Sequence, residues 1–282
     1  MTPINRRTLF VSGAGLAALA LSACGAGGGG ASGPEEKDGV TTINIGASPK
    51  PHAEILQFIQ DNLAKDAGLD LKITPYTDYQ IPNQALNDGD IDANFYQTPN
   101  FLESQEKEKG YEFHAFDGVH VEPMGLYSQS ITSLDELPEG GEVAIANDPA
   151  NRGRGLSLLA DNGVITLKDG VEPTEVTVGD VADNPKNLKF TEIEAAQIPR
   201  SLGDFAAGVV NGNYALEAGL KPSEQAIVLE KGEGSPYANM VVCREADKDN
   251  AGLTKLDELI HSDDVRSFIT STYTDGSVIP AF

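Results

Sequence analysis

The 282-residue sequence predicts an α/β protein of two lobes, each built on a mixed, mostly parallel sheet flanked by helices, with a cleft between the lobes. The first observation is that short β-branched or apolar runs alternate with amphipathic segments, which is typical of strands joined through crossover helices. The second is that this alternation restarts at Glu142, where "GEVAIANDPANRGRGLSLLADNG" again gives a strand, a polar loop and a helix. Open α/β sheets bind ligands at the carboxyl ends of their strands, so the loops of two facing sheets would line the cleft.

The first 23 residues have the anatomy of an export signal. Arg6 and Arg7 precede an apolar run from Leu9 to Leu21, which ends in small residues before Cys24. A helix needs roughly 20 apolar residues to span a bilayer, and this run is shorter. We therefore predict that residues 1–23 are a signal peptide that is removed on export. The arginine pair leaves Sec and twin-arginine export both open.

The stretch "LSAC" resembles a lipobox, the processing site of bacterial lipoproteins. This resemblance implies that Cys24 becomes the first mature residue and carries a lipid anchor; an ordinary secretory signal is the alternative. Residues 24–39 are rich in glycine and lack periodicity, so we expect a flexible tether. The other cysteine, Cys243, then has no disulfide partner and is expected to be a small buried side chain.

The folded part begins with a strand at "TTINIGA", followed by a helix in "HAEILQFIQDNLAKDAG". Ile55, Phe58 and Ile59 fall on one face of this helix, and Gly68 supplies its end. Further strands and helices follow, and the C-terminal helices "LTKLDELIHS" and "DDVRSFITSTY" are expected to return to the first lobe. The predicted division is 40–127 with 239–282 for lobe 1, and 128–238 for lobe 2.

Charge and motifs exclude several classes of function. The net charge of −23 argues against nucleic acid as a partner. The four histidines show no metal-protease spacing, and no nucleophile motif is present. An acidic loop from Asp88 to Asp92 lacks the ligand positions of a calcium site. We therefore predict no catalytic residue, no cofactor and no metal; an extracytoplasmic enzyme on the same scaffold is the most distant alternative.

Four stretches together resemble the NlpA/MetQ family of methionine-binding lipoproteins from about Thr42 to the C-terminus: "YTDYQIPNQALNDGDIDANFYQ", "ANDPANRGRGL", "NPKNLKFTEIEAAQIPRSL" and "SPYANMVV". The resemblance implies a type II-like periplasmic-binding-protein fold. It also implies lipid anchoring on the extracytoplasmic face of the cell membrane. The function it implies is capture of L- or D-methionine for an ABC importer, with a membrane permease and a cytoplasmic ATPase as partners.

The same resemblance assigns ligand-binding residues by position. They are Tyr79, Tyr96, Phe101, Asn151, Arg154, Asn211 and Asn239. Two departures from the family pattern lie near the expected side-chain pocket, because Thr98 replaces a usual histidine and Phe95 replaces a small residue. Another amino acid or a small peptide is therefore the main alternative ligand, and a metal or organic-anion receptor is a weaker one.

These residue types suit a zwitterion with an apolar side chain. The guanidinium of Arg154 can hold both oxygens of a carboxylate in a fork. Asparagine carbonyls can accept from the ammonium group, and aromatic rings can enclose a thioether. Arg152 has no counterpart in the family pattern and is expected to be a solvated surface charge. The stretch "NDPANRG" is equally compatible with a helix N-terminus alone.

Overall fold

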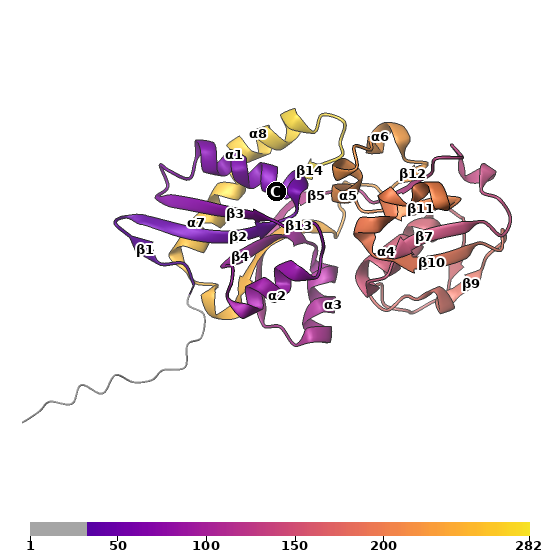
Figure 1. The fold of residues 1–282 in the computed structure, drawn as a ribbon, viewed down its shortest axis with the longest axis horizontal. Coiled ribbons are helices and arrows are strands. Elements are labelled where there is room, and N and C mark those ends of the chain that lie inside the picture. The colour runs from indigo at the N-terminus through magenta and orange to yellow at the C-terminus, as the bar shows by residue number, and fades with distance from the viewer. Residues whose placement is uncertain (1–32) are drawn as a thin grey trace, which may run out of the picture. The chain divides into compact units, whose positions relative to one another are not determined.

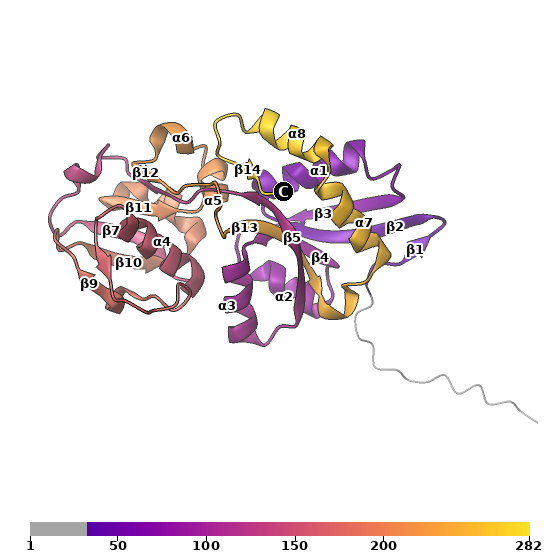
Figure 2. The same cartoon turned by 180° about the vertical axis from the view of Figure 1, so that it is seen from behind.

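The computed structural model describes residues 33–282, so the predicted signal peptide, the predicted lipidation site Cys24 and residues 25–32 of the predicted tether lie outside the described residues. The described residues belong to one compact unit. This unit contains a seven-stranded and a five-stranded sheet, each in its own lobe (Figures 1 and 2). The two-lobed α/β fold predicted from the sequence is confirmed.

The sheet of lobe 1 has the order β1-β2-β4-β13-β5-β14, with β3 beside β2. Strand β2 pairs in parallel with β3 and β4, while β13 runs antiparallel between β4 and β5. The strands are β1 (Glu36–Lys37), β2 (Val40–Ala47), β3 (Leu69–Pro75), β4 (Ala93–Gln97), β5 (Phe113–Val121), β13 (Ala238–Arg244) and β14 (Ile279–Pro280).

The helices of lobe 1 are α1 (Glu54–Asn62), α2 (Ile81–Asp88), α3 (Pro99–Lys109), α7 (Ala251–Ile260) and α8 (Asp263–Thr272). Helix α1 forms because Ile55, Leu56 and Ile59 give it one buried face. The chain leaves it through a turn that ends at Gly68, whose φ of +71° is accessible to glycine. Helices α7 and α8 pack on lobe 1 as predicted, and the rings of Phe58 on α1 and Phe268 on α8 stack at 4.5 Å.

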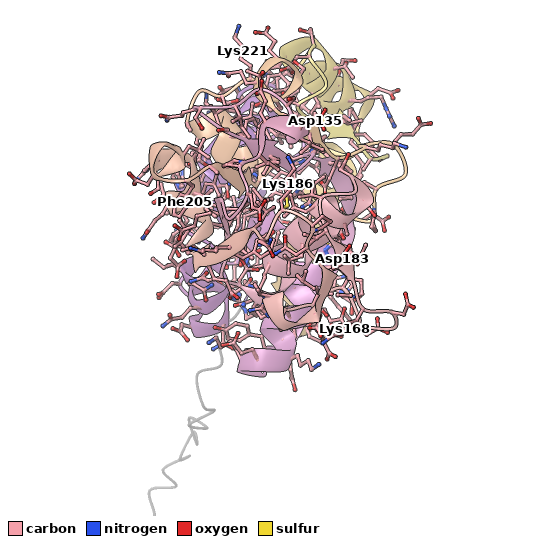
Figure 3. All side chains as sticks on the ribbon, turned by 90° about the vertical axis from the view of Figure 1, so that its right-hand side faces the viewer. Asp135, Lys168, Asp183, Lys186, Phe205 and Lys221 are labelled. Carbon is pink, nitrogen blue, oxygen red and sulfur yellow. The ribbon has the colours of Figure 1, made fainter. Side chains whose placement is uncertain are left out.

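The sheet of lobe 2 has the order β10-β7-β11-β6-β12, and a separate ribbon pairs β8 with β9. The strands are β6 (Gly125–Tyr127), β7 (Glu142–Ala146), β8 (Thr166–Leu167), β9 (Val181–Asp183), β10 (Lys189–Ile193), β11 (Ala207–Val210) and β12 (Val228–Leu229). The helices are α4 (Pro149–Asp161), α5 (Gly212–Glu217) and α6 (Pro222–Gln225). At the outer end of this lobe, Lys186 donates hydrogen bonds to the carbonyls of Leu134, Asp135 and Leu137 (Figure 3).

Short helices of one or two turns complete the described chain. They are η1 (Pro49–Ala53), η2 (Leu134–Glu136), η3 (Val178–Asp180), η4 (Ala195–Arg200), η5 (Leu202–Asp204) and η6 (Glu245–Asp247). No helix in residues 33–282 is long and apolar enough to cross a membrane.

The sheets contain less parallel pairing than the sequence predicted. Parallel pairs join β2 with β3 and β4, and β7 with β10 and β11; the remaining pairs of both sheets are antiparallel. The reason is the exchange of strands at the crossovers. The strand that enters lobe 2, β6, and the strand that returns to lobe 1, β13, both run antiparallel to the neighbours between which they insert.

The predicted boundaries of the lobes and of the tether need correction. Strand β6 pairs with β11 and β12, so the first crossover lies at residues 122–124 and not after Tyr127. The second crossover occupies residues 230–237, between β12 and β13. Residues 33–39 belong to the folded body, because β1 pairs with β2 through a hairpin whose turn residues Asp38 and Gly39 have positive φ. Asn250 also donates a hydrogen bond to the carbonyl of Pro34 at 2.9 Å.

Each lobe has its own apolar core. The larger one, in lobe 1, includes Cys243 of β13, which is fully buried as predicted. Burial raises the pKa of this thiol to about 12. The core of lobe 2 lies under β6, β7 and β11 and includes Leu126, Ile145 and Leu156.

Candidate functional site

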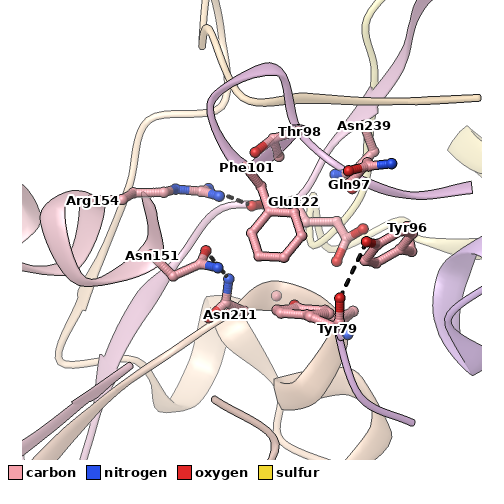
Figure 4. A pocket seen from close by; sticks show the side chains of 12 residues that line it. Tyr79, Tyr96, Gln97, Thr98, Phe101, Glu122, Asn151, Arg154, Asn211 and Asn239 are labelled. Atoms are coloured by element: carbon pink, nitrogen blue, oxygen red, sulfur yellow. Dashed lines mark hydrogen bonds between the residues drawn. The ribbon is translucent and has the colours of Figure 1, made fainter. Parts of the chain in front are cut away.

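The principal candidate site is a cleft to which both lobes contribute (Figure 4). Its cavity volume is only about 20 Å³, so the side chains of the two lobes leave room for little more than a water molecule. All seven residues predicted from the sequence line this one cleft: Tyr79, Tyr96, Phe101, Asn151, Arg154, Asn211 and Asn239. Five more residues line it as well: Gln97, Thr98, Glu122, Gly212 and Asn213.

Three aromatic rings from lobe 1 form an apolar wall of the cleft. Tyr79 precedes α2, Tyr96 lies near the end of β4, and Phe101 lies in the first turn of α3. The ring of Tyr79 is 5.9 Å from that of Tyr96 and 5.6 Å from that of Phe101, and the latter two are 5.8 Å apart. Each pair is within the range of a favourable aromatic contact. The end of β4 and the start of α3 therefore place a small aromatic cluster in the cleft.

Helix α4 brings polar groups from lobe 2. Its N-cap is Asp148, which accepts a 2.9 Å hydrogen bond from the backbone N–H of Asn151. The side-chain amide of Asn151 donates to both oxygens of Asp148, and its carbonyl accepts from Asn211 at 2.7 Å. The stretch "NDPANRG" is thus a helix N-terminus, and it also presents Asn151 and Arg154 to the cleft. Because they are three positions apart, these two residues share one face of the helix.

Arg154 is held on all but one edge of its guanidinium. Its Nε donates to Oε1 of Glu230 at 2.8 Å, and its Nη2 donates to Oε2 of Glu230 at 2.5 Å. Nη2 also donates to the backbone carbonyl of Glu122, and the ring of Tyr237 lies 4.2 Å from the guanidinium carbon. Within residues 33–282 no hydrogen-bond partner is found for Nη1.

These contacts change one expectation. The sequence predicted that Arg154 would form its fork with a ligand carboxylate, but the fork formed by Nε and Nη2 is occupied by Glu230. The side chains of Arg154 and Glu230 are 7% and 15% exposed, so this is a buried ion pair whose charges cancel locally. What remains for a ligand is Nη1.

Arg152 lies away from the cleft lining, as expected, but it is not simply solvated. Its Nε donates to the carbonyl of Val176 at 3.1 Å, and its Nη1 pairs with Glu192 at 3.2 Å. Its side chain is 16% exposed. Arg152 therefore fastens α4 to neighbouring segments of lobe 2.

A buried acid–imidazole cluster, which was not predicted from the sequence, lies beside the cleft and consists of Glu122, His52 and His120. Oε1 of Glu122 lies 2.8 Å from Nε2 of His120 and 3.3 Å from Nε2 of His52. Nε2 of His52 is also 3.0 Å from Oδ1 of Asn239. The spacing of "HVE" at 120–122 was a usable signal, because residues two apart in extended chain point to the same side.

Burial dominates the protonation of this cluster. It raises the pKa of Glu122 to about 7, and electrostatic interactions with Arg154 and with the imidazole of His52 oppose that rise. Burial lowers the pKa of His52 to about 4 and that of His120 to about 3. Both histidines are therefore neutral at pH 7, where each can donate from one ring nitrogen.

In the described part of the chain, these three residues are the only group of potential metal ligands found together, with ligand atoms within 4.8 Å of one another. Their contacts are those of a hydrogen-bonded cluster. Nε2 of His52 faces two oxygen acceptors, on Asn239 and Glu122, and so must carry a proton. The cluster thereby fixes the side chains of Glu122 and Asn239, which both line the cleft.

The two departures from the family pattern occupy different places. Thr98, just before α3, lines the cleft. Phe95 does not line it; its ring is fully buried and packs against the rings of His52 and His120 at 4.7 and 5.3 Å. The expectation that Phe95 lies by the side-chain pocket is therefore wrong, because its position on β4 turns it into the core of lobe 1.

The lobes touch each other across the cleft. The hydroxyl of Tyr79 donates to Oδ1 of Asn213 at 2.5 Å, and that of Tyr214 donates to the carbonyl of Thr77 at 3.4 Å. On the surface, Lys107 of α3 pairs with Glu175 of lobe 2 at 2.6 Å. The structure thus represents a form in which the lobes are closed on each other.

Two cleft residues carry buried polar atoms without a partner. Oδ1 of Asn211 and Nδ2 of Asn213 make no hydrogen bond within residues 33–282. An unpaired buried polar group costs about 1–3 kcal/mol, so such atoms are rare in folded proteins. Oδ1 of Asn211 therefore leaves an unsatisfied acceptor on a residue of the cleft lining.

Comparison with known proteins gives consistent matches over most of the chain. The family model described as NlpA lipoprotein matches residues 43–282. The D-methionine-binding lipoprotein MetQ of Escherichia coli strain K12 is 41% identical over 275 residues, which cover 96% of this chain and 97% of that protein.

Solved structures agree with this match. A nutrient-binding protein of Burkholderia cenocepacia, bound to methionine, is 41% identical with a TM-score of 0.82; the match covers 85% of this chain and 100% of that one. A periplasmic substrate-binding protein of an ABC transporter from Coxiella burnetii is 38% identical with a TM-score of 0.80, also over 85% of this chain and 100% of that one.

Proposed function

The chain belongs to the NlpA lipoprotein family, and we propose that it captures methionine in the cleft and delivers it to the permease of an ABC importer. The names of its relatives support the ligand and the transporter class. The observation that carries the proposal is the composition of the cleft. Three aromatic rings lie in the same buried space as Arg154 and several amides, which matches an apolar side chain attached to a zwitterionic head.

In this proposal Arg154 binds the ligand carboxylate through Nη1, the edge of the guanidinium that the protein leaves free. Asn151 and Asn211 lie beside it and are joined by a hydrogen bond. A charge-assisted hydrogen bond to a carboxylate is roughly twice as strong as a neutral one.

The ammonium group requires acceptors, and we assign three. Oδ1 of Asn211 is buried and unpartnered in the described chain. Asn239 and the carboxylate of Glu122 are held in place by the imidazoles of His52 and His120. An ammonium ion has three donors, so this set can satisfy it.

The thioether chain is assigned to Tyr79, Tyr96 and Phe101. Sulfur–aromatic contacts are worth roughly 0.3–1.5 kcal/mol each, and the rings also exclude water from the apolar chain. Thr98 lies in the same lining and offers a hydroxyl where a purely apolar pocket would have none. It keeps a second candidate open, a binding protein for another amino acid or a small peptide.

The cellular setting follows from the same proposal. Lipid on Cys24 would hold the protein on the extracytoplasmic face of the cell membrane, within reach of the permease. A Cys24→Ala variant should be lost from the membrane fraction and incorporate no labelled palmitate. Retention of the variant in the membrane would contradict the anchor.

Isothermal titration of the detergent-purified protein tests the ligand, since the chain has no tryptophan to quench. We expect one site that binds L- or D-methionine more tightly than leucine, glutamate or the dipeptide glycyl-methionine. Mass spectrometry of ligand released from the purified protein gives an independent answer. If the dipeptide or another amino acid binds more tightly than both forms of methionine, the second candidate replaces the first.

A further inference from the structure

Both carboxylate oxygens of Glu230 accept hydrogen bonds from Arg154. Its Oε2 also accepts a 2.7 Å hydrogen bond from the backbone N–H of Met124. Glu230 opens the second crossover and Met124 lies in the first. The ion pair is therefore fixed from both segments that join the lobes, and the guanidinium cannot turn toward a ligand without breaking it.

Charge is distributed unevenly in the cleft. Among residues 33–282, Arg154 is the only cationic side chain that lines it, and its charge is balanced by Glu230. The cleft lining also contains the carboxyl group of Glu122, while Asp148 lies behind Asn151. No cation in the described lining is left without a carboxylate partner.

This balance determines which ligand charge the cleft can accept. A zwitterion brings one positive and one negative group and leaves the sum unchanged. A monoanion of the same shape would add a negative charge to a buried site. In that site the carboxylates already equal or outnumber the cations. Burying a charge without a partner is costly, so the two ligands should differ in affinity well beyond one hydrogen bond.

We propose that Glu230 is a specificity-determining residue: by neutralising Arg154, it makes the cleft select zwitterionic amino acids over anions of the same shape, such as the corresponding α-hydroxy acids. The inference rests on the proposed function and deepens it. Glu230 reaches the ligand through Arg154 and is thus a positioning residue with an electrostatic role.

The test uses three ligands that share the side chain of methionine but differ in net charge. Methionine is neutral overall, its α-hydroxy acid analogue is an anion, and methionine amide is a cation. In Glu230→Gln, which keeps the shape but not the charge, Arg154 gains an unbalanced positive charge. The affinity for the hydroxy acid relative to methionine should rise at least about tenfold, and that for the amide should fall.

Two variants control this experiment. Glu192→Gln removes the carboxylate that pairs with Arg152. Arg152 lies on the same helix as Arg154 but outside the cleft, so all three affinities should stay unchanged. Glu230→Asp keeps the charge on a shorter side chain. The ratio of the affinities for the hydroxy acid and for methionine should stay within about threefold of its wild-type value, even where every ligand binds more weakly. If Glu230→Asp changes this affinity ratio as much as Glu230→Gln does, the charge of Glu230 does not determine the selectivity.

The outcomes separate the inference from the function on which it rests. If Glu230→Gln changes all three affinities by one common factor, Glu230 is only structural and the inference fails while methionine binding stands. If wild-type protein binds no methionine, both fail. Wild-type protein alone gives a further check that needs no variant to fold: the hydroxy acid should bind at least about a hundredfold more weakly than methionine, and binding within threefold would overturn the inference.

Discussion

The hydroxyl of Tyr79 in lobe 1 donates a 2.5 Å hydrogen bond to Oδ1 of Asn213 in lobe 2. The two residues are 134 positions apart, and both line the cleft. This bond therefore exists only when the lobes are closed, and it belongs to the surface that we propose binds the ligand. We therefore expect Tyr79 to contribute both to closure of the lobes and to ligand binding.

Replacing Tyr79 with phenylalanine removes this bond and keeps the ring. We expect methionine affinity to fall by about two- to tenfold, because one buried hydrogen bond contributes roughly 0.5–1.5 kcal/mol to the closed form. Calorimetry gives the affinity, and small-angle scattering gives the mean opening of the lobes without ligand. Tyr111→Phe, at a tyrosine that stacks on Phe113 away from the cleft, is the matched control. Equal affinities for both variants would argue against a closing role for Tyr79.

Replacing Arg154 with alanine should abolish binding of every α-amino acid and also weaken the fold. Glu230 would be left buried without its partner, a loss of about 3–5 kcal/mol in the free energy of unfolding. The double variant Arg154→Met with Glu230→Leu should recover most of that stability and none of the binding. Thermal melting and calorimetry on the same samples separate the two effects. Binding by the double variant would show that the guanidinium is dispensable.

Glu122 makes a prediction about pH. Its pKa is raised from 4.5 to about 7 in the folded protein, so the folded state holds a proton that the unfolded state releases between these values. This group's contribution to stability is therefore complete below about pH 4.5 and declines as the pH rises to 7. Relative to wild type, ligand-free Glu122→Gln should gain of the order of 3 kcal/mol across this window.

The comparison with Glu122→Gln isolates one group of a cluster. The lowered pKa values of His52 and His120 act in the opposite sense, since they cost stability as the pH falls below about 6.5. Both histidines are present in both proteins, so their effect largely cancels in the difference. Urea unfolding at pH 4.5, 5.5, 6.5 and 7.5 supplies the measurement. A difference that stays constant across the series would mean that folding does not raise the pKa of Glu122.

Gly153 on α4 makes a prediction about stability. A Cβ atom there would lie 1.8 Å from the carbonyl oxygen of Pro173, so the backbone of residue 173 occupies the space of a side chain. Gly153→Ala should lower the melting temperature, with a cost of about 1–3 kcal/mol or more from the forced displacement. Ser157→Ala, one turn further along the same helix, should cost less than about 0.5 kcal/mol. Equal melting temperatures of the two variants would show that the backbone of residue 173 does not occupy this space.

The sequence was sufficient for the fold class and for one set of residues in the cleft. Strand and helix patterns have local signals, and the strand-end loops of an α/β sheet converge for topological reasons. The seven predicted cleft residues came from a resemblance with preserved spacing, and they do lie together. Their roles in ligand binding are assigned by our proposal.

What the sequence did not reveal depends on contacts between distant segments. Glu230 is 76 positions from Arg154, and nothing near either residue indicates the pair. His52 meets Glu122 and Asn239 only because η1, the first crossover and β13 converge. The hairpin at β1 was missed for a different reason: its Asp-Gly turn signal lies next to a glycine-rich stretch, which dominated the interpretation of the whole segment.

The buried thiol of Cys243 has a practical consequence for following domain motion. Because the side chain is sealed within β13 and its pKa is about 12, almost no thiolate is available to alkylating reagents at neutral pH. With Cys24 lipidated as proposed, or replaced, a cysteine introduced on the exposed surface of each lobe could then carry a spin label or fluorophore against a silent background. The distance between two such labels would report opening and closing directly, in a chain that has no tryptophan to do so.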